Sequence, residues 1–335
     1  MPCFFKAALW LVVAWAAGPT NGASAASAGG PSAREPAPAP SDYTFEILLR
    51  LQIFLDAENF GPGQIDGKAG EFTRKAVAAW NVANGYDDTE DWRPALRQSQ
   101  RRVNALYAAY RIKAGDLAFL SPKLPEKPAD QAALDYLGYR SLAEFVAERY
   151  HTSEGSLARL NPGQPLATLR AGEWLKVPNV EPFRLEELRP QQAWNANNPL
   201  SARSVLVDTD QKTASFYDED GYLFASFPIT PGQTRFVPLG EWKMEVMLAL
   251  PQYRWDKQML EQGKRSKNAS LLPAGPNSPV GVMWAGLNKS GIGLHGTATP
   301  ETIGRSRSAG CIRFANWDAV RLPSLVRPGS RVLIK

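Results

Sequence analysis

The sequence is poor in the residues on which several kinds of protein depend. Histidine and cysteine occur twice each in 335 residues, so any chemistry that uses them is confined to few positions. Lysine and arginine form no run and no basic stretch interleaved with aromatic residues, which argues against a nucleic-acid partner. Beyond the N-terminus, no segment is apolar for the roughly 20 residues that a membrane span needs. We therefore expect a mature protein with no transmembrane span and no bound nucleic acid.

The composition is that of a globular protein with more than one domain. Hydrophobic residues make up 44% and charged residues 21%, which is ample for a buried core. A length of 335 residues suits two or three domains. The formal net charge of +5 favours acidic or polyanionic surroundings.

The first 25 residues have the pattern of a secretory signal peptide. Lys6 precedes an apolar run from Ala7 to Ala17, and the small residues Ala23-Ser24-Ala25 form a cleavage site. The apolar run is too short for an ordinary membrane span. We expect residues 1–25 to be removed on export; the alternative is an anchor that is retained.

Export gives the second cysteine a special position. Cys3 would be lost with the signal peptide, which leaves Cys311 as the single thiol of the mature chain. A single cysteine in a secreted protein indicates a reactive thiol or an intermolecular disulfide, and an inert buried cysteine is the alternative. Its position in a loop directly after Gly310 favours the reactive thiol.

The N-terminal half is predicted to hold two small units joined by flexible segments. Residues 26–42 are rich in Ala, Pro, Ser and Gly and form a linker. Residues 43–86 contain two amphipathic helices around the turn Ile65-Asp66-Gly67-Lys68-Ala69-Gly70, which resembles a peptidoglycan-binding module. The alternative is a helical cap in which Asp66 only closes an Asx turn. Residues 87–133 are predicted to be a connector, with a helix from 92 to 109.

Residues 134–180 resemble a lysin motif (LysM), a β-α-α-β module that binds polymers of N-acetylglucosamine. The resemblance rests on two short helices, the stop Asn161-Pro162-Gly163 and a final strand at Trp174-Leu175-Lys176-Val177. The first strand of the module is weak in this sequence. We expect His151, between the helices, to be solvated or to cap a helix.

After a polar linker at 181–202, residues 203–335 change to a strand pattern. Short alternating segments separated by turns predict a β-sandwich or a partly closed barrel, with one short helix at 317–326. The whole chain is thus predicted to be a multidomain α+β protein.

The stretch from Gly291 to Asn316 contains both His295 and Cys311. A histidine and a cysteine that meet across a glycine-rich loop form an activated thiolate nucleophile. Gly310 has no side chain, so the backbone at this position can approach a substrate closely. The N–H of Cys311 is suited to stabilise an oxyanion. Arg313 lies two residues further along the same strand and should share the strand face of Cys311.

These residues resemble the L,D-transpeptidase (YkuD-type) catalytic domain. The resemblance rests on His295-Gly296-Thr297, on Ser308-Ala309-Gly310-Cys311-Ile312-Arg313 and on a Gly-Pro-Asn stretch at 273–281. It implies acyl transfer on peptidoglycan stem peptides, with Cys311 as nucleophile and His295 as proton donor and acceptor. The family has a second histidine where this chain has Ala309, so His295 must transfer the proton alone.

The resemblance also implies substrate-binding and oxyanion residues around this pair. These are Gly310, Ser308, Arg313, Gly296, Thr297, Arg305 and Trp284. Arg307 is a further residue that could meet a carboxylate. A solvated loop is the alternative for Arg305 and Arg307, and a core aromatic is the alternative for Trp284.

Three functions remain open from the sequence. The first is an L,D-transpeptidase of the periplasm and cell wall that forms 3-3 cross-links or attaches a wall-anchored protein. The second is a carboxypeptidase or a hydrolase that releases wall proteins, with water as acceptor. The third is a non-catalytic protein that only binds peptidoglycan. We expect neither a metal nor a cofactor in any of them.

Overall fold

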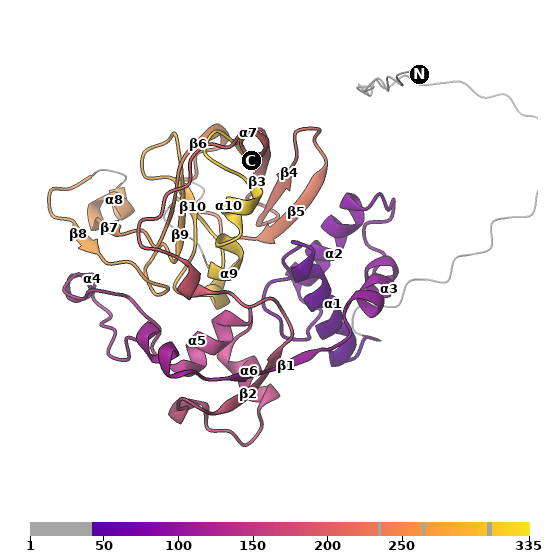
Figure 1. Cartoon of the computed structure of the whole chain (residues 1–335). Helices are drawn as coiled ribbons and strands as arrows, with labels where there is room; N and C mark the ends of the chain where they lie inside the picture. The colour runs from indigo at the N-terminus through magenta and orange to yellow at the C-terminus, as the bar shows by residue number, and fades with distance from the viewer. Residues whose placement is uncertain (1–41, 234–235, 263–264, 307–309) are drawn as a thin grey trace, which may run out of the picture. The chain divides into compact units, whose positions relative to one another are not determined.

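The computed structural model describes residues 42–335, except 234–235, 263–264 and 307–309 (Figure 1). All of the described residues belong to one compact unit, Ala37–Lys335. The predicted signal peptide and all but the last residue of the predicted linker at 26–42 lie outside the described residues. Within the described ranges, no helix has the length and apolar character needed to cross a membrane.

The described chain begins with three helices, α1 (Phe45–Ala57), α2 (Glu71–Ala83) and α3 (Arg93–Arg102). The turn between α1 and α2 is fixed by Gln52, whose side-chain oxygen accepts hydrogen bonds from the N–H groups of Asp66 and Gly67. The Asp66 carboxylate accepts a hydrogen bond from the N–H of Lys68 at 3.0 Å, which is an Asx turn. Residues of this turn therefore stabilise its conformation within the helical unit, through hydrogen bonds to Gln52 and within the turn.

A two-stranded antiparallel sheet follows, and its strands are separated in sequence by two longer helices and by shorter helical segments. Its elements are β1 (Tyr107–Arg111), α5 (Leu142–Arg149), α6 (Glu154–Leu160) and β2 (Trp174–Pro178). This is a β-α-α-β order, but β1 lies at 107–111, inside the range predicted to be a connector. The predicted helix at 92–109 was wrong beyond Arg102, because pairing with a strand more than 60 residues away determines the conformation of β1.

Shorter helical elements lie within these units and between them. They are the 3₁₀ helices at Ala114–Phe119, Leu166–Thr168, Leu185–Glu187 and Pro300–Thr302, and the short helices α4 (Pro128–Gln131) and α7 (Asn198–Ser201).

His151 is buried, which corrects the expectation of a solvated or capping side chain. Its Nδ1 lies 3.1 Å from a carboxylate oxygen of Asp56 in α1, and its ring stacks on Trp317. Arg321 donates a hydrogen bond to the same carboxylate at 2.8 Å. The α1 helix, the β-α-α-β unit and the C-terminal segment are therefore joined by one buried polar cluster.

The C-terminal segment is built on one eight-stranded mixed sheet in the order β11-β10-β9-β6-β12-β3-β4-β5. Figure 1 labels β3, β4, β5, β6, β9 and β10 of this sheet. The strands are β3 (Ser204–Asp208), β4 (Thr213–Tyr217), β5 (Leu223–Pro228), β6 (Gly240–Ala249), β9 (Met283–Leu287), β10 (Gly293–His295), β11 (Ile312–Arg313) and β12 (Arg331–Ile334). A separate hairpin of β7 (Tyr253–Trp255) and β8 (Ser270–Leu272) carries α8 (Lys257–Gln262).

The two ends of the large sheet meet. Thr230, just after β5, and Arg313, in β11, form an antiparallel bridge with reciprocal backbone hydrogen bonds of 2.9 Å. The sheet is therefore curled, in keeping with the partly closed barrel that was one of the two predicted architectures. The predicted helix at 317–326 is two short helices, α9 (Asn316–Ala319) and α10 (Leu322–Leu325), because Pro323 starts a new helical turn.

Candidate active site

The sheet brings His295 and Cys311 to the same face. Strand β10 pairs in parallel with β11, with His295 opposite Arg313, so Cys311 lies beside the start of β10. Strand β9 pairs antiparallel with β10 and sets Trp284 opposite His295. Because successive side chains of a strand alternate between faces, these four side chains project from one side of the sheet.

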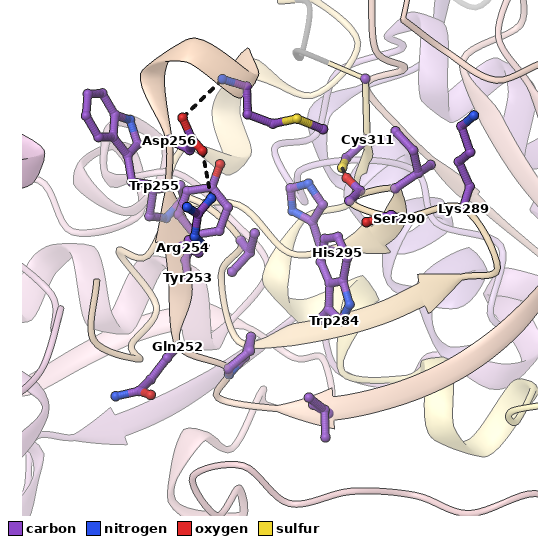
Figure 2. A pocket seen from close by; sticks show the side chains of 18 of the residues that line it. Gln252, Tyr253, Arg254, Trp255, Asp256, Trp284, Lys289, Ser290, His295 and Cys311 are labelled. Carbon is purple, nitrogen blue, oxygen red and sulfur yellow. Dashed lines mark hydrogen bonds and ion pairs between the residues drawn. The ribbon is translucent and has the colours of Figure 1, made fainter. Parts of the chain in front are cut away.

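All four side chains line a cavity of about 650 Å³. Figure 2 shows His295 and Cys311 turned into this cavity, with the segment from Gln252 to Asp256 across from them. The two residues that the sequence predicted to be the catalytic pair therefore share one cavity.

His295 is only 4% exposed, and its neighbours fix its tautomer. Its Nδ1 lies 2.6 Å from the carbonyl oxygen of Gly296. A carbonyl can only accept, so Nδ1 carries the proton and Nε2 is left as the basic nitrogen. The pKa of His295 is lowered to about 3, mainly by burial; the hydrogen bond to the Gly296 carbonyl opposes this effect and the charge of Arg313 adds to it. The imidazole is consequently neutral near pH 7.

Cys311 is partly exposed, and its thiol donates a hydrogen bond to the carbonyl of Gly291 at 3.2 Å. Burial raises the pKa of the thiol to about 11, against the opposing effects of the Gly293 backbone and of Arg313. The resting site thus holds a neutral thiol beside a neutral imidazole rather than the activated thiolate that the sequence suggested. The physical reason is desolvation, which penalises both charged forms.

The cavity is rich in cations. Arg254, Arg265, Lys289 and Arg313 line it together with the carboxylate of Asp256. Among the described residues, Nε of Arg313 is buried without a hydrogen-bond partner. A cavity of this charge favours a ligand that carries carboxylates.

The β7–β8 hairpin supplies the far wall of the cavity, which the sequence did not predict. Asp256 holds the hairpin together, since its carboxylate pairs with Arg254 at 2.6 Å and accepts from the N–H groups of Met259 and Ser266. Arg265 donates to Ser290 Oγ at 2.9 Å, which ties the hairpin to the loop between β9 and β10. The clustered polar residues between 254 and 267 were the available signal.

Tyr253 is a cavity residue of the same hairpin that the sequence did not predict to belong to the site. It lines the cavity, and burial raises the pKa of its phenol to about 12, with a further contribution from Cys311. The phenol is therefore neutral and is available as a hydrogen-bond donor across the cavity from the thiol.

Of the other predicted site residues that the structure describes, only some line the cavity. Gly310 lines the cavity, whereas Gly296 and Thr297 are buried and are not among the residues that line it. Arg305 is exposed and also lies outside the lining, so the solvated alternative describes it better. Ser308, Arg307 and Ala309 lie outside the described residues.

Residues 202–334 match the family model of the L,D-transpeptidase catalytic domain, YkuD. The YqjB protein of Bacillus subtilis, which carries the provisional name of an L,D-transpeptidase, is 32% identical over 143 residues. That alignment covers 41% of this chain and 74% of YqjB. The chain belongs to the L,D-transpeptidase family.

A second relative with the same provisional name is YkuD of Bacillus licheniformis, at 27% identity over 57% of this chain and 92% of that protein. Among solved structures, L,D-transpeptidase 3 of Mycobacterium tuberculosis aligns with a TM-score of 0.32 and 12% identity, over 50% of this chain and 76% of that chain. A mutant L,D-transpeptidase of Enterococcus faecium aligns with a TM-score of 0.29 and 16% identity, over 39% of this chain and about half (49%) of that chain.

The family match nearly coincides with the range 203–335 that the sequence predicted for the L,D-transpeptidase domain. The units at 43–86 and 134–180 lie outside it. Their identities as a peptidoglycan-binding module and a LysM module stay predictions.

Proposed function

We propose that this chain is an exported cysteine L,D-transpeptidase that acts on peptidoglycan stem peptides in the periplasm. The observation that carries the proposal is the common cavity of His295 and Cys311, in which the Gly296 carbonyl leaves Nε2 of His295 as a base. The products would be 3-3 cross-links or proteins attached to the wall.

In the acylation step, Sγ of Cys311 attacks the carbonyl carbon at the L-centre of the third residue of a stem tetrapeptide. His295 accepts the thiol proton as the C–S bond forms, which avoids a stable thiolate in a desolvated site. The proton then passes from His295 to the nitrogen of the terminal D-alanine. The C–N bond breaks, D-alanine leaves and a thioester remains on Cys311.

In the second step, an amine of a second stem peptide or of a protein lysine attacks the thioester. His295 removes a proton from the attacking nitrogen and returns it to sulfur as the C–S bond breaks. The Gly310–Cys311 backbone would meet the carbonyl oxygen in both steps. With water as the acceptor, the same steps would give a carboxypeptidase.

Two features of the cavity support a stem peptide as substrate. Arg313, Arg254, Arg265 and Lys289 suit the free carboxylates of such a peptide. Trp284 offers an apolar surface for its aliphatic parts. Thr297 and Gly296 would then support His295 from behind rather than bind substrate.

The test is muropeptide analysis of sacculi incubated with the purified chain after removal of residues 1–25. We expect release of D-alanine and new 3-3 cross-links, and we expect Cys311→Ala and His295→Ala to abolish both. Arg305→Ala is the matched control, because Arg305 is exposed outside the cavity, and it should retain activity. Shortened stems without cross-links would identify water as the acceptor. Binding to sacculi without D-alanine release would leave only the non-catalytic function.

A further inference from the structure

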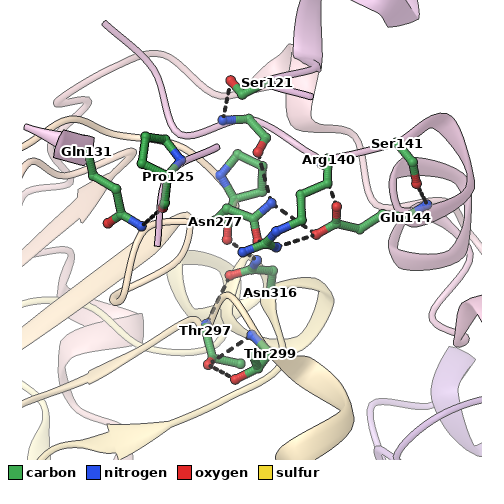
Figure 3. A network of polar contacts seen from close by, with 12 residues as sticks. Ser121, Pro125, Gln131, Arg140, Ser141, Glu144, Asn277, Thr297, Thr299 and Asn316 are labelled. Carbon is green, nitrogen blue, oxygen red and sulfur yellow. Dashed lines mark hydrogen bonds and ion pairs between the residues drawn. The ribbon is translucent and has the colours of Figure 1, made fainter. Parts of the chain in front are cut away.

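Asn316, the first residue of α9, is fully buried behind the cavity. Its side-chain amide makes hydrogen bonds with three separate backbone segments. Oδ1 accepts from the N–H groups of Val282 at 3.1 Å and Thr297 at 3.2 Å, and Nδ2 donates to the carbonyl of Pro276 at 3.2 Å. Figure 3 shows Asn316 between Asn277 on one side and Thr297 on the other.

One of these contacts leads directly to His295. The N–H that Thr297 donates to Asn316 belongs to the same peptide group as the Gly296 carbonyl that accepts from Nδ1 of His295. A peptide group is planar, so fixing its N–H fixes the direction of its carbonyl. Hydrogen bonds in series also strengthen each other, so an acceptor on the N–H makes the carbonyl a better acceptor for the imidazole.

The neighbouring glycines show how closely the backbone surrounds this amide. A Cβ on Gly296 would lie 2.1 Å from Oδ1 of Asn316, and a Cβ on Gly281 would lie 2.0 Å from it. Gly281 also has a φ of +57°, which favours glycine. The glycine at 296, which the resemblance implied to be a substrate contact, is required here for the approach of Asn316.

We infer that Asn316 is a positioning residue, which holds His295 in the Nδ1–H tautomer through the Gly296–Thr297 peptide group. It touches neither the thiol nor the cavity, and it acts only through this peptide. The effect on acyl transfer rests on the proposed function, whereas the effect on the tautomer does not.

Asn316 is itself anchored outside the catalytic sheet. Glu148 of α5 is buried next to Asn316, whose side chain acts to lower the pKa of this carboxyl against the larger effect of burial. Pro276, which accepts from Asn316, is followed by Asn277, whose amide donates to the carbonyl of Gly138 at 2.8 Å and to Glu144 at 2.9 Å. The β-α-α-β unit thus contributes to the support of the residue that orients His295.

The tautomer can be measured directly because the chain has only two histidines. The ¹⁵N shifts of the ring nitrogens would be recorded on the full chain labelled in histidine, and His295→Gln would assign the signals. We expect the wild type to show Nδ1–H at His295 and Asn316→Ala to show a mixture of tautomers. We also expect Asn316→Ala to lower kcat for D-alanine release about tenfold to a hundredfold with little change in KM.

Two variants test whether Asn316 orients His295 or only stabilises the surrounding structure. Asn277→Ala removes contacts of the same network without touching the Gly296–Thr297 peptide, so it should lower the melting temperature and keep the tautomer. Asn316→Asp keeps an acceptor for the Thr297 N–H and should also keep the tautomer. An unchanged tautomer in a folded Asn316→Ala protein, or a loss of kcat no larger than that of Asn277→Ala, would overturn the inference. If Asn316→Ala changes the tautomer but the wild-type protein has no transferase activity, the inference about Asn316 stands and the proposed function is refuted.

Discussion

Trp284 and His295 lie opposite each other in the register of β9 and β10, and their rings stack with centroids 5.6 Å apart and an interplanar angle of 25°. The indole has room because the adjacent pair, Gly286 and Gly293, has no side chains. A Cβ on either glycine would come within 2.9 Å of the indole. The stacked indole and the Gly296 carbonyl therefore restrict the imidazole from two directions.

We expect Trp284→Ala to slow the acylation of Cys311 about tenfold or more, because the imidazole loses one of its two restraints. The rate of adduct formation with a carbapenem, followed by intact-protein mass spectrometry, is the measurement. Trp284→Phe keeps a ring over His295 and should retain most of the rate. Trp174→Ala is a control, since this indole is 59% exposed on β2, outside the cavity lining. Equal rates for Trp284→Ala and the wild type would contradict a role for the stacking.

The pH dependence of acylation should be flat over about pH 5–9. The neutral imidazole that accepts the proton is lost only as pH falls through the His295 pKa of about 3, and the neutral thiol only as pH rises through about 11. Rate constants for carbapenem acylation across this range provide the measurement.

Alkylation of Cys311 by iodoacetamide offers a contrasting measurement on the same thiol. This reaction uses the thiolate, so its rate should rise steadily toward the thiol pKa of about 11. An inflection near pH 6.5 in the acylation rate would instead indicate a thiolate–imidazolium pair in the resting enzyme.

Asp256→Ala should loosen the hairpin that forms the far wall of the cavity. The variant loses the pair with Arg254 and the two backbone hydrogen bonds from Met259 and Ser266. We expect KM for a disaccharide-tetrapeptide to rise at least about tenfold, because the wall must order on binding. Alkylation of Cys311 by iodoacetamide should be as fast as in the wild type or faster. A slower alkylation would show that the loss extends to the thiol itself.

Asp318→Asn should change how stability depends on pH. Neither carboxylate oxygen of Asp318 has a hydrogen-bond partner among the described residues, and burial raises its pKa to about 8. Because the folded pKa lies above the unfolded value, the protonated carboxyl contributes fully below about pH 4, and this contribution is lost as pH rises toward 8.

Between these pH values the free energy of unfolding of the wild type falls by at most about 1.4 kcal/mol per pH unit because of Asp318. The Asp318→Asn variant lacks this decrease. Urea unfolding at pH 5 and at pH 7.5 should show the free energy of unfolding of Asp318→Asn rising relative to the wild type. The exposed Asp220→Asn is the control and should show no such change. A constant difference between Asp318→Asn and the wild type would contradict the raised pKa.

The sequence predicted the parts of the site that depend on local pattern. His295 and Cys311 lie in short motifs with turn-forming residues, and the strands of the large sheet have alternating residues with Asp-Gly or Gly-rich turns between them. The helices of 43–86 were predicted for the same reason. Local pattern was enough in each of these cases because the conformation is set by neighbours in sequence.

Other features depend on contacts distant in sequence and were missed. Strand β1 is defined by its pairing with β2, and the burial of His151 is defined by Asp56 and Trp317. The neutral state of Cys311 results from desolvation in the assembled cavity, which no motif records. Nothing in the sequence indicated that the amide of Asn316 makes hydrogen bonds with three separate segments of backbone.

Strand β12 links the two groups of strands that make up the large sheet. Strand β12 pairs with β3 on one side and with β6 on the other, although it follows both by more than 80 residues. On one side of β12 lie β6, β9, β10 and β11, and on the other side lie β3, β4 and β5, so β12 joins the two groups whose outer ends meet at Thr230 and Arg313. The catalytic cavity therefore depends on a strand that contributes none of its lining residues, and a change that weakens the pairing of β12 should disturb the site without touching it.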